Sequence, residues 1–374
     1  MAQLFLWTHK IDEALREEFQ LRFGAPAPEA LLDLHESLPG EFIRFLGFYP
    51  MEEVLSEERR PPFMMPGLVP FGEDRDGDYY CFYIPWRDGD GRVPYGVWMH
   101  ETGHFLPFSY DMRAFLVWWL GRQVLDSLGG DDWPEMRRIL ELFQGAVGLE
   151  ETDLILTPPA SDLAWHSEIL KIDPAGGFSL SLQALRTFAA QGFDATLAQF
   201  EAAERSMPTF GAASLWQARL LAMRGATRRA HEAYFRHLGG PMFANGYHYL
   251  WDAGDLMVPE VSEVEALEFI YNAETPPPDH LLAHPKIDFF REHDPANWKD
   301  RIAFAKLLEQ RQLFAAALAE MENAFFLEGW NEAVAKELLE TLLCIYPEQN
   351  RIREAEQCRM ALAKLAESPP SASE

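Results

Sequence analysis

Residues 100–104 have the sequence His-Glu-Thr-Gly-His, which contains the side chains of a zinc peptidase site. In a helix with the pattern H-E-x-x-H, the two histidines share one face. His100 and His104 would then bind one zinc ion, and Glu101 would act as the general base for the zinc-bound water. This spacing predicts a metal-dependent hydrolase, provided that the motif lies within a helix and that a third ligand follows it.

The residues on either side of the motif favour a β-hairpin. Residues 93–99 are mostly aromatic or β-branched, which is typical of a strand. Gly103 would cost about 1 kcal/mol relative to alanine inside a helix, and Pro107 would remove a backbone donor. We therefore predict a turn at residues 101–103, a return strand at 105–106 and no bound metal or other cofactor. The zinc hydrolase is kept as the alternative.

The residues around the motif predict an antiparallel sheet flanked by helices. Residues 68–71 form a short apolar run, and residues 79–84 are almost entirely aromatic, which indicates strands. Glycine-containing turns at residues 73–78 and 88–91 would join them to the strand at 93–99. After Pro107, residues 110–128 have apolar side chains at helical spacing. A helix is also predicted at residues 30–37, and a second helix begins at Pro39.

The two turns carry most of the acidic side chains near this sheet. An EF-hand would need glycine and glutamate where Tyr79 and Pro85 stand, so a solvated turn is favoured over a calcium site. We expect these side chains to be exposed and to form the surface that meets a partner, with these residues: Glu73, Asp74, Asp76, Asp78, Asp88 and Asp90.

The order of these elements resembles the SUKH superfamily, which includes cell-wall-synthesis regulators and bacterial toxin-immunity proteins. The resemblance covers residues 30–125 and rests on Leu38-Pro39, Phe42, Phe45-Leu46, Val69-Pro70-Phe71-Gly72, Gly77-Asp78-Tyr79-Tyr80 and Phe115-Leu116. It implies an α+β fold that binds proteins and has no general catalytic residue. The chain has a long insert at residues 51–63 and lacks the Asn-Gly that often follows the second helix of the family.

The composition restricts the class of partner. The chain of 374 residues has 32 Lys and Arg against 59 Asp and Glu, a net charge of −27. Such a charge argues against direct binding to nucleic acid or to anionic membranes, and it suits a basic protein partner, although it can also simply keep the protein in solution. Three cysteines without a C-x-x-C pattern indicate a reducing compartment. We interpret the brief apolar run at residues 1–7 as too short for a signal peptide, and no later stretch reaches about twenty apolar residues, so we predict a cytoplasmic protein.

The second half of the sequence is predicted to be helical. Apolar residues recur at helical spacing in pairs of segments, and residues 315–326 resemble tetratricopeptide-type repeats because alanine is frequent where helices approach closely. A plain helical bundle remains the alternative architecture. We predict a SUKH-like domain at 1–150, an irregular connection at 151–177, a helical repeat-like domain at 178–366 and a disordered tail at 367–374.

Taken together, the sequence predicts an α+β domain followed by an all-α domain in a protein that binds and does not catalyse. The resemblance implies an immunity protein that neutralises a toxin domain, with a basic domain as the expected partner. The alternatives are a regulatory scaffold of the cell-wall-synthesis-regulator type and the zinc hydrolase that would use His100, Glu101 and His104.

Overall fold

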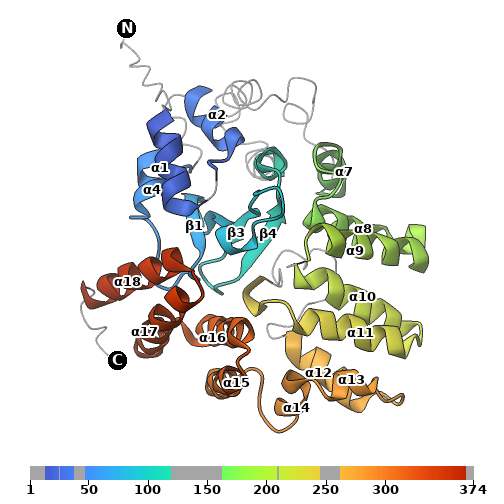
Figure 1. Cartoon of the computed structure of the whole chain (residues 1–374). Coiled ribbons are helices and arrows are strands. Elements are labelled where there is room, and N and C mark those ends of the chain that lie inside the picture. The colour runs from blue at the N-terminus through green and yellow to red at the C-terminus, as the bar shows by residue number, and fades with distance from the viewer. Residues whose placement is uncertain are drawn as a thin grey trace. The chain divides into compact units, whose positions relative to one another are not determined.

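A computed structural model describes residues 13–24, 26–37, 47–118, 162–208, 210–244 and 262–367 (Figure 1). These residues form a four-stranded sheet in the N-terminal part and α-helices in most of the rest, which confirms the coarse fold class. Several expected features lie outside the described residues, in whole or in part. They are the helix beginning at Pro39, the end of the helix at 110–128, the start of the connection at 151–177 and the C-terminal tail.

The contacts within the chain divide it into two compact units. Unit 1 comprises Met1–Arg59, Val69–Trp98 and Pro107–Ala190, and unit 2 comprises Arg60–Leu68, Met99–Leu106 and Gln191–Glu374. The structure therefore groups residues 60–68 and 99–106 with the C-terminal helices, although the expected boundary placed them in the first domain. Residues 162–172, in the expected irregular connection, form helix α7 (Asp162–Ile172).

The sheet is a meander in which strands adjacent in sequence are adjacent in space. Its order is β1 (Leu68–Glu73), β2 (Tyr79–Tyr83), β3 (Tyr95–Trp98) and β4 (Phe105–Ser109). Tyr80 pairs with Val97 across the antiparallel β2 and β3. Pro107 was expected to precede a helix, but it lies within β4. This strand is at the edge of the sheet, where a missing backbone donor is tolerated.

The aromatic residues of the strands form the core of unit 1. The ring of Phe71 lies 6.2 Å from that of Phe82 and 5.7 Å from that of Phe115 in the helical residues 112–118. Helix α1 (Glu13–Phe23) covers the sheet through Phe19 and Phe23, each with its ring centroid 5.7 Å from Phe82. Helices α2 (Glu29–Ser37) and α4 (Met51–Ser56) belong to the same unit. The nearly continuous aromatic sequence of β2 is thus explained by burial.

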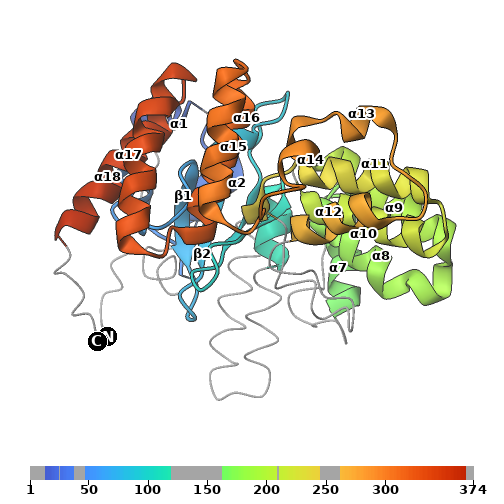
Figure 2. The same ribbon diagram turned by 90° about the horizontal axis from the view of Figure 1, so that it is seen from below.

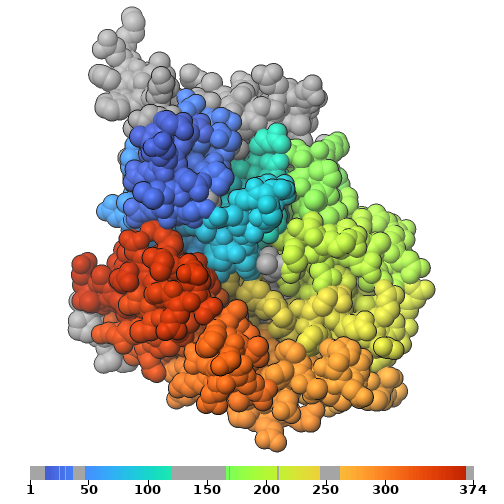
Figure 3. All heavy atoms as spheres, viewed as in Figure 1, coloured from blue at the N-terminus to red at the C-terminus, as the bar shows by residue number. Residues whose placement is uncertain are grey.

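Unit 2 is built from helices that each pack on the next in sequence. One series is α9 (Phe193–Ser206), α10 (Gly211–Met223), α11 (Thr227–Leu238) and α12 (Ser262–Asn272). The other is α15 (Trp298–Gln310), α16 (Phe314–Glu328), α17 (Glu332–Glu348) and α18 (Ile352–Glu367) (Figures 1 and 2). Atoms of the second series, orange to red, pack closely in Figure 3. Sequential packing of this kind is how helical-hairpin arrays are built.

Three hairpins of unit 2 share one turn conformation. Gly225, Gln312 and Asn350 have φ values of 74°, 61° and 59° and follow α10, α15 and α17. In each turn the next residue donates a backbone hydrogen bond to the carbonyl five residues earlier, as Ala226 does to Leu221 at 2.9 Å. This is the Schellman ending of a helix. A buried alanine follows each turn residue five positions later, where the next helix approaches: Ala230, Ala317 and Ala355.

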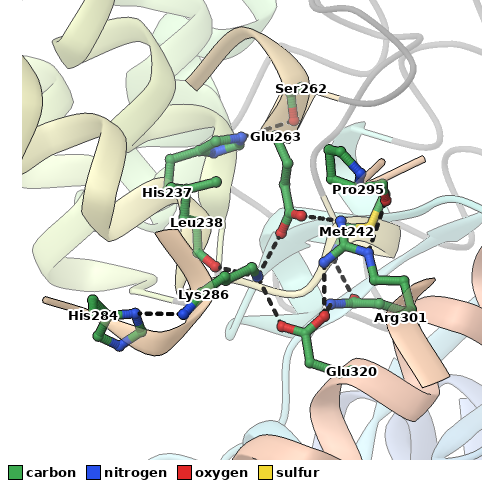
Figure 4. A network of polar contacts seen from close by, with 11 residues as sticks. His237, Leu238, Met242, Ser262, Glu263, His284, Lys286, Pro295, Arg301 and Glu320 are labelled. Atoms are coloured by element: carbon green, nitrogen blue, oxygen red, sulfur yellow. Dashed lines mark hydrogen bonds and ion pairs between the residues drawn. The ribbon is translucent and has the colours of Figure 1, made fainter. Parts of the chain in front are cut away.

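A buried network of four charged side chains joins α12 of the first series, the short helix α14, and α15 and α16 of the second series (Figure 4). Lys286 in α14 (Pro285–Phe289) contacts Glu263 and Glu320, each at 2.9 Å. Arg301 contacts Glu320 at 2.7 Å and also pairs with Glu263. The two cations also donate to backbone carbonyls of Leu238 and Pro295. Burial acts to raise the pKa of Glu320, but Lys286 and Arg301 lower it to about 2. The network is therefore charged and electrically balanced.

Removing one cation from this network should destabilise unit 2 strongly. Arg301 is fully buried, so Arg301→Leu would leave Glu263 and Glu320 with one cation in the interior. We expect a loss of about 3–5 kcal/mol in the free energy of unfolding. Arg224→Leu is the matched control because Arg224 pairs with Asp194 at the surface, where a loss below about 1 kcal/mol is expected. Urea unfolding followed by circular dichroism measures both, and equal losses would contradict this role of the network.

Candidate functional site

The two acidic turns lie at opposite ends of the sheet. Turn 73–78 joins β1 to β2, and turn 88–91 lies between β2 and β3, so the whole length of β2 separates them. A strand of five residues spans roughly 15 Å. The acidic residues named from the sequence thus form two groups. They do not form one continuous surface along the sheet.

The first turn is organised by the carboxylate of Asp74. Its Oδ1 accepts hydrogen bonds from the backbone N–H groups of Asp76 at 3.0 Å and Asp78 at 2.9 Å. Asp74 is only partly exposed, and burial raises its pKa, against the lowering effect of the hydrogen bond from the Asp78 N–H. Glu73 accepts a hydrogen bond from the hydroxyl of Tyr49 at 2.7 Å. Exposure was therefore a wrong expectation for Asp74, since this side chain stabilises its own turn, and Glu73, Asp78 and Asp88 are likewise only partly exposed. Asp76 is exposed.

The second turn has the same construction. Oδ1 of Asp88 accepts from the backbone N–H groups of Asp90 and Arg92, each at 2.9 Å, and Oδ2 pairs with the Arg92 guanidinium at 2.8 Å. Partial burial acts to raise the pKa of Asp88, but the Arg92 N–H and side chain lower it overall. Asp90 has a side chain that is 82% exposed. Asp76 and Asp90 are thus the acidic residues best placed to meet another molecule.

The H-E-T-G-H sequence forms the hairpin turn between β3 and β4, as predicted. The N–H groups of Thr102 and Gly103 donate to the carbonyl of Met99, and Gly103 has a φ of 72°. His104 is buried with its ring edge-on to Phe326, at a centroid distance of 4.7 Å, whereas Glu101 is exposed. His100 and His104 therefore do not share the face of a helix. In the part of the chain that the structure describes, no three His, Cys, Asp or Glu side chains are grouped to hold a metal ion.

An open groove of about 770 Å³ lies along α1 and the start of α2 in unit 1. The charged residues that line it are four glutamates and one arginine: Glu13, Glu17, Glu18, Glu29 and Arg16. Arg16 of α1 donates to both carboxylate oxygens of Glu29 of α2, at 2.8 and 3.0 Å, and so joins the two helices that line the groove. The groove is strongly negative because the other three carboxylates are exposed. We call it the acidic groove.

The apolar centre of the acidic groove is provided by α1. Leu21 is 87% exposed and lies on the side of the helix opposite to Phe19 and Phe23, which pack on the sheet. Glu17 and Glu18 precede Leu21 by four and three residues and so flank it one turn earlier. The acidic groove was not predicted from the sequence. The sequence pattern that could have indicated it is a pair of phenylalanines four residues apart, with a leucine on the opposite side of the same helix.

The end of α1 also lies beside the second acidic turn. The guanidinium of Arg87 donates to the carbonyl of Phe23 at 3.3 Å, and Gly24 approaches the same group. Asp88 and Asp90 lie one and three residues after Arg87 in the sequence. The structure thereby brings Arg87 to the end of α1, and it leaves turn 73–78 at the other end of β2.

A histidine and serine in unit 1 form a hydrogen bond that could suggest nucleophilic catalysis. Nδ1 of His166 lies 3.0 Å from the hydroxyl of Ser179, but the two residues are only 4% and 0% exposed. Burial lowers the pKa of His166 to about 3, with a further lowering effect from Arg186. A side chain that substrate cannot reach does not act as a nucleophile, so this pair is structural.

The comparisons with known proteins do not assign a family. No family model matches the sequence, and no curated protein matches it. Matches were found to 28 chains of solved structures, among them a human IFIT1 dimer with PPP-AAAA. That match has 14% identity and a TM-score of 0.21, and it covers 68% of this chain and 56% of the other. The chain thus spans little more than half of that structure, and a TM-score of this size supports no inference. In the described residues no helix is both long and apolar enough to cross a membrane.

Substitution of Asp74, whose carboxylate holds its turn together, should destabilise the protein more than substitution of the exposed Asp76. Asp74→Ala removes two hydrogen bonds of the turn, so we expect a loss of about 1–3 kcal/mol in the free energy of unfolding. Asp74→Asn retains an acceptor oxygen and should cost less, and Asp76→Ala should change stability by less than about 0.5 kcal/mol. Chemical denaturation of the three variants measures this order, and an equal loss for Asp76→Ala would contradict it.

Burial of His166 makes stability depend on pH. Its pKa is lowered to about 3 in the folded state, so between pH 3 and 6.5 the unfolded chain binds a proton that the folded chain does not. The unfolded chain therefore becomes more stable relative to the folded chain as the pH falls below about 6.5. At pH 5 the free energy of unfolding is lower by about 2 kcal/mol for this reason.

The test compares urea unfolding at pH 7.5 and pH 5 for His166→Gln and for His293→Gln. His293 is exposed and serves as the control. We expect His166→Gln to flatten the pH dependence and His293→Gln to leave it unchanged. An unchanged slope in His166→Gln would show that other groups cause the pH dependence.

Proposed function

We propose that this chain is a non-catalytic protein-binding module that captures a basic partner domain at the acidic groove. The observation that carries the proposal is the groove itself, with about 770 Å³ of open space and four glutamates against one arginine among its lining residues. Complementary charge accelerates the encounter of two proteins and selects the partner. The net charge of −27 acts in the same direction.

The finer proposal is that the partner is a bacterial toxin domain and that the chain is its immunity protein in the cytoplasm. Its support is the SUKH-like order of elements, in which α2, the four-stranded meander and the helix at 112–118 follow one another. An odd number of cysteines suits a reducing compartment. A regulatory scaffold of the cell-wall-synthesis-regulator type would use the same surfaces with a different partner.

Unit 2 is proposed to be a degenerate tetratricopeptide-like array that supports binding. The recurring Schellman turn at Gly225, Gln312 and Asn350, with a buried alanine five residues later, is the support for a repeat over a plain bundle. Arrays of this type usually present binding surfaces. Among the acidic turns, we assign the exposed Asp90 to the partner surface because Arg87 of the same loop contacts the end of α1, whereas Asp76 lies at the other end of β2 and outside this surface.

The zinc hydrolase is the alternative, and it would require a different conformation at residues 100–104. In the hairpin turn, His104 contacts Phe326 and is buried, so it does not join His100 on one face as the hydrolase motif demands. One zinc per chain after dialysis, lost in both His100→Ala and His104→Ala, would favour this alternative over binding alone.

Co-expression tests the toxin-neutralisation proposal. We expect the product of the gene directly upstream to arrest growth when expressed alone and this chain to restore growth. The variant Glu13→Gln, Glu17→Gln, Glu18→Gln should restore growth less well because the acidic groove has lost three charges. The matched control carries Glu332→Gln, Glu337→Gln and Glu340→Gln on exposed positions of α17. No arrest, or equal loss of rescue in both variants, would contradict the proposal.

A further inference from the structure

The outer face of α1 has a regular pattern of apolar and acidic side chains. Ala14 and Leu21 are seven residues apart, which is two helical turns or about 10 Å. Glu17 and Glu18 lie between them, on either side of the line that joins them, and Glu13 begins the same face. All five side chains are exposed, and all five line the acidic groove. The inner face of the same helix is occupied by its packing on the sheet.

This pattern is complementary to one kind of peptide. A partner helix lying along the groove would place apolar residues against Leu21 and Ala14 if they were also spaced by seven. Lysine or arginine three or four positions from those residues would then meet Glu17 and Glu18. An exposed leucine supplies attraction that salt does not screen, and the carboxylates supply attraction that salt does screen. The combination selects against peptides that are only basic and against peptides that are only apolar.

We propose that the occupant of the acidic groove is a basic amphipathic helix of the partner, with Leu21 as its apolar contact and Glu17 and Glu18 as its charge contacts. The inference rests on the proposed protein-binding function and specifies the element that the partner must present.

The probe is a fluorescein-labelled peptide of about five helical turns with leucine at positions spaced by three, four and seven and lysine beside each. Its control has the same composition in an order that scatters the leucines around the helix. Fluorescence anisotropy with the full-length chain measures the dissociation constants. We expect the amphipathic peptide to bind at least about tenfold more tightly than the scattered one.

Substitutions in the chain identify the site of binding. Leu21→Ser should weaken binding of the amphipathic peptide about 10–100-fold, since a leucine side chain would no longer be buried. Glu17→Gln with Glu18→Gln should weaken it at low salt and have little effect at high salt. The matched controls are Leu313→Ser and Glu340→Gln, which change exposed residues of unit 2 and should leave the affinity unchanged. All these residues are exposed, so the melting temperature should remain nearly constant.

The outcomes distinguish the occupant from the function. Equal affinity for the two peptides, or affinity indifferent to Leu21→Ser, would overturn the amphipathic helix as the occupant. The toxin-neutralisation proposal would still stand if growth were restored in the co-expression test. Peptide binding that requires Leu21, together with a failure to restore growth, would support the helix as the occupant and reject neutralisation of that gene product.

Discussion

Four charges enclosed in a protein interior are the constraint on which unit 2 depends. Glu263, Lys286, Arg301 and Glu320 come from four helices, and each carboxylate contacts both cations. A displacement of any of these helices would leave one buried charge unbalanced in a medium of low dielectric constant, at a cost of several kcal/mol. The network lies where the regular hairpin is replaced by the short helices α13 (Asp279–Leu282) and α14. It fixes the arrangement of helices there, where the recurring Schellman turn is absent from the described residues.

The charges of unit 1 are used in a different way. In unit 2 the buried cations and carboxylates balance one another and are closed to solvent, so they determine structure. Along α1 the carboxylates are exposed and outnumber the cations, and the apolar residue among them is almost fully accessible. Asp74 and Asp88 form an intermediate class, because their oxygens accept backbone hydrogen bonds within their own turns. Which carboxylates remain available to another molecule is therefore decided by their hydrogen bonds and ion pairs, and this cannot be inferred from acidity alone.

The local structure of this chain could be predicted from its sequence, but the contacts between distant residues could not. Glycines mark the turns at Gly77, Gly91 and Gly103, and apolar periodicity marks most helices of unit 2, because both signals act over a few residues. The charged network has no such signal, since Glu263 and Glu320 approach the same cations from far apart in the sequence. The repeated turn was missed because Gln312 and Asn350 take a conformation that usually indicates glycine. The alanine that follows each turn residue five positions later is the sequence pattern that could have indicated the repeated turn. The acidic groove required the knowledge that Phe19 and Phe23 face the sheet.

The contact between Gln357 and residues 67–68 has a consequence for the order of events during synthesis. In unit 2, Oε1 of Gln357 accepts from the N–H of Gly67 at 2.6 Å, and its amide donates to the carbonyl of Leu68 at 3.2 Å, across a separation of about 290 residues. At about 5–20 residues per second, a ribosome needs roughly 15–60 s to proceed from one side of this contact to the other. Leu68, whose carbonyl is one of the two partners of Gln357, is fully buried in the finished protein. The backbone of residues 67 and 68 therefore gains these two hydrogen bonds only after nearly the whole chain has been synthesised.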